Sequence, residues 1–85
     1  MKNHSFTLAM SDEGMPVKVV ALLGGNGLHR RMTEMGLNVG AELVVRQRMG
    51  GRLVVSRGET RYALGNGMAH RIMVAPASPA MEAQP

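Results

Sequence analysis

The chain has 85 residues, a formal net charge of +4 at pH 7 and no cysteine. This length fits one small domain, and the absence of cysteine excludes disulfides, thiolate metal sites and thiol catalysis. No apolar run is long enough to cross a membrane, and the N-terminal stretch lacks a signal-peptide core, so we expect a cytoplasmic protein.

The basic residues are mostly arginine, which accounts for eight of the ten. Arginine favours partners that carry carboxylates or phosphates, although a net charge of +4 is also ordinary for a small soluble domain. The aromatic residues are Phe6 and Tyr62, and nine methionines are present. We therefore expect a core of aliphatic side chains in which methionine fills the gaps.

The first part of the chain predicts a lead-in followed by a strand. Phe6, Leu8 and Met10 alternate with other residues, a pattern that would add an edge strand or a cap. Residues 16–23 form the first firm strand, because they are rich in valine and leucine and end at the glycine-rich stretch 24–27.

Residues 28–35 form the only segment that reads as a helix with both ends specified. Asn26 is the expected N-cap, because its side-chain oxygen can accept a hydrogen bond from the first turn. Gly36 is expected to stop the helix in the left-handed conformation, with Leu37 packing back on Met32. The apolar stripe of the helix consists of Leu28, Met32 and Met35.

Gly50 and Gly51 mark a hairpin between the expected strands 41–48 and 52–57. A two-residue loop would set the inward Val45 opposite Ser56 and put the two apolar faces out of phase. We therefore expect a three-residue loop, residues 49–51, containing a bulged turn. This register pairs Val45 with Val55, Gln47 with Leu53 and Arg48 with Arg52.

The second hairpin is expected to turn at two residues, Gly58 and Glu59. Its register places apolar pairs on the core face, so strands 41–48, 52–57 and 60–64 make a meander with one apolar side. The pairs are Val55 with Tyr62 and Leu53 with Leu64.

Residues 68–74 predict a tight turn and a final short strand. The pattern as a whole indicates a mainly β fold, a small, partly open barrel of about five strands with one short α-helix between the first two firm strands. We expect the domain to span residues 1–75. Residues 76–85 are rich in alanine and proline, and they predict a disordered tail.

Three kinds of chemistry are weakly supported. The glycines of 24–27 precede a helix as in a phosphate-binding loop, but Arg30 stands where a dinucleotide fingerprint needs glycine, and the Walker lysine is absent. A plain strand-to-helix turn is favoured. No two of the three histidines share a helical face, so plain surface histidines are favoured over a bridging surface metal, and we expect no metal site. No nucleophile and base are placed as a pair for catalysis.

The outward face of the meander is predicted to carry four arginines beside a modest apolar strip. Like charges opposite one another are mildly destabilising, so Arg48 facing Arg52 would make sense on a surface that binds an acidic partner. Four solvated arginines that splay apart are an equally simple alternative. The face consists of Val44, Arg46, Arg48, Arg52, Val54, Ser56, Arg61 and Ala63.

Residues 30–40, with the sequence Arg-Arg-Met-Thr-Glu-Met-Gly-Leu-Asn-Val-Gly, resemble the signature R-L-x-E-L-G-L-x-P-G of the ferrous iron transport protein A (FeoA) family. The similarity extends to residues 50–55, 62–64 and 68–74, with Val39 where the family commonly has proline. The resemblance implies a small cytosolic SH3-like barrel without catalysis or cofactor. It also implies an accessory role with the membrane ferrous iron permease FeoB, at that partner's cytosolic GTP-hydrolysing domain.

Register and resemblance together predict a docking module. We expect the helix and the loop 49–51 to frame a shallow groove whose arginine rim attracts acidic or phosphorylated surfaces. The alternative is a nucleic-acid binder, which is disfavoured because register buries Tyr62 and leaves no stacking platform. The expected partner-binding residues are Arg30, Arg31, Met35, Leu37, Arg46, Arg48, Met49 and Arg52, and the expected structural glycines are Gly36, Gly40, Gly50 and Gly51.

Overall fold

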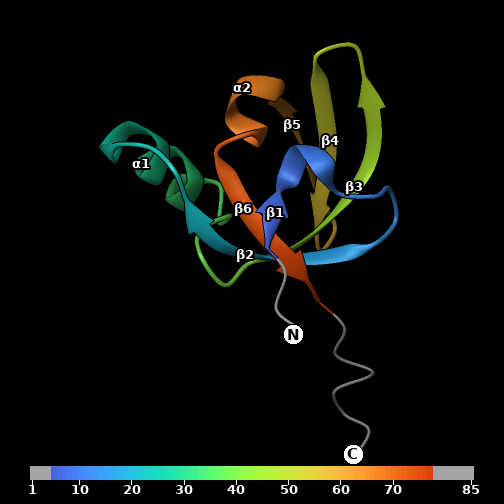
Figure 1. Cartoon of the computed structure of the whole chain (residues 1–85), viewed down its shortest axis with the longest axis horizontal. Coiled ribbons are helices and arrows are strands. Elements are labelled where there is room, and N and C mark those ends of the chain that lie inside the picture. Colours follow the sequence, from blue (N-terminus) through green and yellow to red (C-terminus); the bar gives the residue numbers. More distant parts are fainter. Residues whose placement is uncertain (1–4, 78–85) are drawn as a thin grey trace, which may run out of the picture.

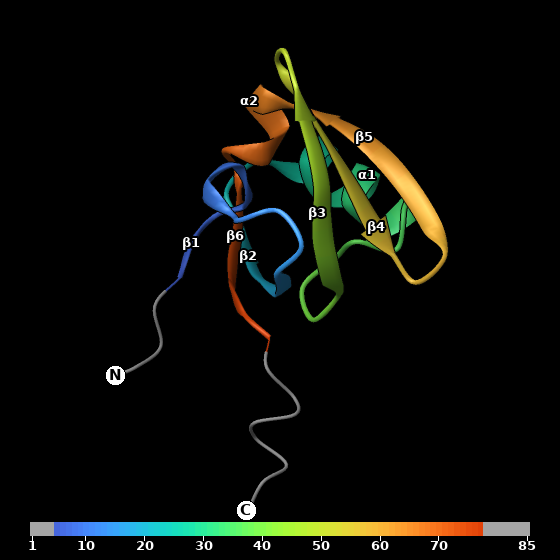
Figure 2. The ribbon, with the colours of Figure 1, turned by 90° about the vertical axis from the view of Figure 1, so that its right-hand side faces the viewer.

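The computed structural model describes residues 5–77, which form one curled antiparallel sheet with two α-helices and one short 3-10 helix (Figure 1 and Figure 2). The sheet has six strands in the order β1-β6-β2-β3-β4-β5, so β1 and β5 lie at its two edges and the barrel is not closed. The elements are β1 (Phe6–Thr7), the 3-10 helix η1 (Leu8–Met10), β2 (Pro16–Leu22), α1 (Asn26–Glu34), β3 (Glu42–Met49), β4 (Arg52–Arg57), β5 (Thr60–Gly65), α2 (Asn66–Ala69) and β6 (Ile72–Pro76).

The predicted mainly β, SH3-like architecture with one short helix after the first firm strand is confirmed, and the structure adds β1 as a sixth strand. This two-residue edge strand pairs with β6, with Phe6 opposite Val74. β6 also pairs with β2, so the last strand lies between the first two. Within residues 5–77, no helix has the length and apolar character needed to cross a membrane.

The N-terminal end of α1 differs from the prediction. Gly25 is the N-cap, and no side chain caps the free backbone N–H groups. Asn26, the expected cap, is instead the first residue of the helix. The backbone carbonyl of Gly25 accepts hydrogen bonds from Leu28 and His29, both at 3.2 Å, so the helix starts one residue earlier than expected.

The C-terminal end of α1 confirms the predicted stop. Gly36 has a φ of 74°, and its N–H donates to the carbonyl of Thr33 at 3.0 Å. The N–H of Leu37 donates to the carbonyl of Met32 at 2.7 Å. These two bonds define a Schellman motif. Leu37 and Met32 stand at the positions that form the hydrophobic contact of this motif, and both side chains are fully buried in the core cluster.

The core fills the inner side of the sheet with aliphatic side chains, as the composition predicted. Met32 and Leu37 link α1 to it, Leu8 links η1, and Ala69 links α2. The buried cluster consists of Leu8, Val17, Val19, Met32, Leu37, Ala41, Leu43, Val45, Leu53, Val55, Leu64, Ala69, Ile72 and Val74.

The hairpin between β3 and β4 has a two-residue loop, so the predicted three-residue loop is wrong. Gly50 and Gly51 have φ values of 44° and 33°, as a type I′ turn requires at both central residues. Met49 therefore pairs with Arg52, and Arg48 pairs with Leu53 rather than with Arg52.

A β-bulge reconciles this short loop with an apolar core. The register shifts between Val45 and Gln47, which leaves Arg46 as the extra residue. On the side of the shift away from the loop, Val45 pairs with Val55 as predicted. On the side next to the loop, Gln47 pairs with Val54 and not with Leu53. A two-residue loop alone would put the apolar faces of the two strands out of phase, and the inserted Arg46 brings them back into phase.

The second hairpin has the predicted register. Val55 pairs with Tyr62 and Leu53 with Leu64, and the chain turns at Gly58, whose φ is 61°. β5 then runs into α2, a single helical turn at the place of the predicted tight turn, and β6 follows.

The expected tail, residues 76–85, lies outside the described residues from position 78 onward. Within the described range, Pro76 is the last residue of β6. Ala77 is buried, and its N–H donates to the carbonyl of Pro16 at 3.0 Å.

Candidate functional site

The bulge in β3 moves Arg48 from the outer to the inner side of the hairpin. Residues opposite one another in an antiparallel pair share a face, and Arg48 lies opposite the buried Leu53. The Nη2 atom of Arg48 donates to the carbonyl of Ala9 at 2.9 Å and to that of Ser11. Arg48 therefore anchors the N-terminal segment.

Two further contacts hold the same segment against β3. The backbone N–H of Arg48 donates to the Glu13 carboxylate at 3.1 Å, and the N–H of Gly14 donates to the carbonyl of Val45 at 2.8 Å. The outward position predicted for Arg48 is therefore wrong. The cause is the register of the hairpin, which pairs Arg48 with the inward Leu53 and brings it to residues more than thirty positions away in the sequence.

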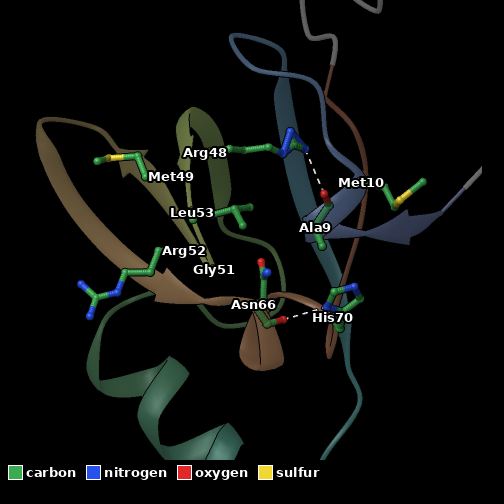
Figure 3. A pocket seen from close by; sticks show the side chains of 10 residues that line it. Ala9, Met10, Arg48, Met49, Gly51, Arg52, Leu53, Asn66 and His70 are labelled. Atoms are coloured by element: carbon green, nitrogen blue, oxygen red, sulfur yellow. Dashed lines mark hydrogen bonds between the residues drawn. The ribbon is translucent and has the colours of Figure 1, made fainter.

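A pocket of about 350 Å³ lies between the hairpin tip, η1 and α2 (Figure 3). Arg48 points across it toward Ala9. On the α2 side, the His70 ring nitrogen Nδ1 lies 2.8 Å from the backbone oxygen of Asn66. The lining residues are Ala9, Met10, Arg48, Met49, Gly50, Gly51, Arg52, Leu53, Asn66 and His70.

The outer face of the hairpin retains Arg46 and Arg52 and gains Met49. The Arg46 Nε–H donates to the Ser56 hydroxyl at 2.9 Å. Met49 and Arg52 lie opposite one another, are exposed and point away from the pocket (Figure 3). Met49 is 54% exposed, so this face combines an apolar contact at the hairpin tip with a neighbouring arginine, Arg52, and a second one, Arg46, farther along β3.

The predicted residues of the helix region lie in a different place. Arg30 and Arg31 are exposed on α1. Met35 is half-buried, and its carbonyl accepts a hydrogen bond from the Tyr62 hydroxyl at 2.8 Å. Leu37, predicted as core or groove, is a fully buried core residue.

The expectation that the helix and the loop 49–51 frame one groove is therefore corrected. The wall opposite the loop is formed by η1 and α2. Arg31 instead lines a second pocket, of about 320 Å³, between α1 and α2. Its other lining residues are Leu28, Gly67, Met68 and Arg71.

Sequence reasoning did not assign Met68 or Arg71 to any surface. Both belong to the stretch 68–74, whose apolar residues indicated only a turn and a strand. The one sequence feature that could have indicated a groove here is Gly67, which leaves space beside Met68. Nothing in the sequence pattern places α2 beside α1.

Among residues 5–77, no group of three or more His, Asp or Glu side chains is placed to hold a metal ion. The four glycines predicted as structural all have positive φ values: 74° at Gly36, 99° at Gly40, 44° at Gly50 and 33° at Gly51.

Comparison with known proteins assigns the family. The model of the FeoA domain matches residues 6–76, which is nearly the whole described chain. The chain belongs to the FeoA family. The signature segment 30–40 corresponds in the structure to the second half of α1, the Schellman stop and the turn into β3. Val39, where the family commonly has proline, is 57% exposed.

Three relatives support the assignment. The proposed Fe(2+) transport protein A of Methanocaldococcus jannaschii is 35% identical over 69 residues, covering 81% of this chain and 84% of its own. A crystal structure of an iron uptake regulatory protein, FeoA, is 32% identical with a TM-score of 0.80, and it covers 87% of this chain and 100% of its own.

The third relative is the zinc complex of Stenotrophomonas maltophilia FeoA, described as an SH3 domain protein and proposed as a ferrous iron transport activating factor. It is 28% identical with a TM-score of 0.70, covering 81% of this chain and 88% of its own. The FeoA fold of this chain is thus shared with independently solved structures.

Proposed function

We propose that this FeoA-family chain is a non-catalytic cytosolic accessory protein of ferrous iron uptake. In this proposal it docks on the membrane transporter FeoB, at its cytosolic GTP-hydrolysing region. The observation that carries the proposal is the family match over residues 6–76. Two relatives named for ferrous iron transport support it, one from Methanocaldococcus jannaschii and one from Stenotrophomonas maltophilia.

The outer face of the β3–β4 hairpin is the proposed first contact with the transporter. Arg52 lies opposite the exposed Met49 on this face, and Arg46 lies farther along β3, where it donates to Ser56. Opposite charges steer association and fix orientation, while an apolar anchor supplies contact area. Arg48, which donates to the carbonyls of Ala9 and Ser11, acts in this proposal by holding the hairpin in place.

The alternative of nucleic-acid binding has less support. Single-stranded nucleic acid is bound by exposed aromatic rings on which bases stack. Phe6 and Tyr62 are half-buried, and the Tyr62 hydroxyl is occupied by the Met35 carbonyl. A protein surface is therefore the better match for these arginines.

The test is binding of the purified chain to detergent-solubilised FeoB and to its isolated cytosolic domain, with a random oligonucleotide as control, at two salt concentrations. We expect binding to FeoB and none to the oligonucleotide. Oligonucleotide binding that falls steeply with salt, without FeoB binding, would contradict the proposal, because that pattern reports phosphate contacts.

The proposed face is tested by a charge-reversed pair, Arg46→Glu with Arg52→Glu. We expect FeoB binding to weaken by roughly tenfold, because two attractive contacts become repulsive. A matched control, Lys18→Glu with Arg57→Glu, makes the same change of charge at two other exposed basic residues, one on β2 and one at the end of β4 far from Met49. Equal losses in both variants would show a general charge effect and no specific face.

A further inference from the structure

The groove between α1 and α2 is separate from the hairpin face. Leu28 of α1 and Met68 of α2 are half-buried and form its apolar floor. Gly67 leaves one wall low, since a Cβ atom added there would meet nothing within 4 Å. The volume of about 320 Å³ is near the lower end for ligand pockets, so the groove suits a few side chains rather than a large cofactor.

Further apolar surface adjoins one end of the groove. The backbone N–H of Leu23 donates to the carbonyl of Arg71 at 2.7 Å, which places Leu23 next to the groove in the chain path. Leu23 is 53% exposed. An exposed leucine beside half-buried Leu28 and Met68 is the kind of apolar surface that marks a contact site.

The charges of the groove point to the chemistry of its occupant. Its lining contains two guanidinium groups, Arg31 and Arg71, and no carboxylate. Within residues 5–77, Arg46 and Arg48 donate side-chain hydrogen bonds, whereas the side chains of the two groove arginines donate none. Charged groups beside an apolar floor favour a partner that brings both apolar side chains and carboxylates.

We propose that the α1–α2 groove binds an acidic amphipathic segment of a protein partner. The apolar side chains of the segment lie on Leu28 and Met68, and its carboxylates pair with Arg31 and Arg71. This is the helix-in-groove mode of recognition, read by residues spaced one helical turn apart. The inference rests on the proposed docking function, because it gives the same partner a second contact surface.

The probe is a short synthetic helix-forming peptide with two leucines at i and i+4, flanked by glutamates. A control peptide has lysine in place of each glutamate, and a second has serine in place of each leucine. Amide chemical shifts of the full-length ¹⁵N-labelled chain are followed during titration. We expect shifts centred on Leu28, Gly67 and Met68 with the acidic leucine peptide, and weak or no shifts with either control.

Two variants separate the steric from the electrostatic part of the inference. Gly67→Leu fills the groove without a change of charge, and Gly27→Leu is its control, because Gly27 also has open space but does not line the groove. Arg31→Glu with Arg71→Glu reverses the charge of the groove rim. Its control is Arg57→Glu with Arg61→Glu, two arginines that do not line the groove. We expect roughly tenfold weaker peptide binding in each groove variant and little change in the controls.

Three results would overturn the inference: no shifts up to millimolar peptide, equal binding of the lysine peptide, or shifts confined to the hairpin. Binding to FeoB distinguishes this failure from failure of the proposed function. If FeoB binding is lost in Arg46→Glu with Arg52→Glu but unchanged in both groove variants, the docking function stands and the groove is not its site. If the peptide binds but FeoB does not, the groove stands and the partner is a different protein.

Discussion

The C-terminal stop of α1 and the β3–β4 hairpin are both anchored by a small number of hydrogen bonds, but over very different distances along the chain. At the stop, the N–H of Leu37 reaches the carbonyl of Met32, five positions earlier. At the hairpin, Arg48 reaches the carbonyls of Ala9 and Ser11, 39 and 37 positions away. The first anchor joins residues that are close in the sequence, whereas the second forms only after the sheet has brought distant residues together.

The largest effect is expected when the apolar part of the local anchor is removed. Leu37→Ala deletes a fully buried side chain of the core cluster that also contains Met32, so we expect a loss of about 3 kcal/mol in the free energy of unfolding. Urea denaturation measures it. Val39→Ala, at a position that is 57% exposed, is the control and should stay within about 0.5 kcal/mol. Similar values for both would mean that the stop does not carry core packing.

Breaking the long-range anchor should cost less but should act at a distance. Arg48→Ala removes two charge-assisted hydrogen bonds from a largely exposed guanidinium, so we expect a loss of about 2 kcal/mol. Amide hydrogen exchange should accelerate selectively in residues 8–14. Arg52→Ala, at the neighbouring exposed arginine, should change neither quantity. Uniform acceleration across the sheet would show that Arg48 stabilises the whole fold and not this segment.

The backbone of the local anchor is tested by Gly36→Ala. A side chain at φ of 74° is strained, and we expect a loss of about 1 kcal/mol after allowing for the stiffer unfolded chain. Gly27→Ala is the matched control inside α1, where φ is not positive and alanine should stabilise by up to about 1 kcal/mol. Opposite signs in thermal or urea unfolding support the Schellman geometry, and equal signs contradict it.

The smallest effect is expected at the bulge itself. Ser56→Ala removes the acceptor of the Arg46 Nε–H, but the exposed guanidinium can turn to water, so we expect a loss of about 0.5 kcal/mol. A double-mutant cycle with Arg46→Ala isolates the pair. A coupling energy near zero would show that this contact accompanies the bulge without stabilising it.

The same contrast explains how much could be predicted from the sequence. The helix stop needed only Gly36 and the apolar spacing around it, and the second hairpin needed only Gly58 and two alternating strands, so both were predicted correctly. The prediction of the N-cap residue was wrong because Gly25 and Asn26 are adjacent and either can cap a helix. Local chemistry narrowed the N-cap to these two adjacent residues but did not choose between them.

The first hairpin shows where pattern reasoning ends. The three-residue loop was chosen because it pairs Val45 with Val55 on the core face. A two-residue loop with a bulge at Arg46 produces the same pair. The bulge brings Arg48 to its acceptors in the N-terminal segment, which no local pattern contains. The candidate surfaces were affected most, because one inserted residue reassigns the side chains that follow it to opposite faces.

The groove residues were missed for a related reason. Arg31 was expected to act beside the hairpin, but the structure places it next to Met68 and Arg71. That neighbourhood depends on the pairing of β6 with β2, two segments some fifty residues apart in the sequence, because α2 directly precedes β6.

The position of β6 also has a consequence for synthesis of the protein. Because this last strand lies between β1 and β2, each of these strands lacks its shared neighbour until Val74 and the residues around it have been made. Contacts between such distant segments slow folding, and unpaired strand edges favour aggregation. On the ribosome, the helix stop and the β3–β5 meander can form early, but the six-stranded sheet is complete only after β6 has left the exit tunnel.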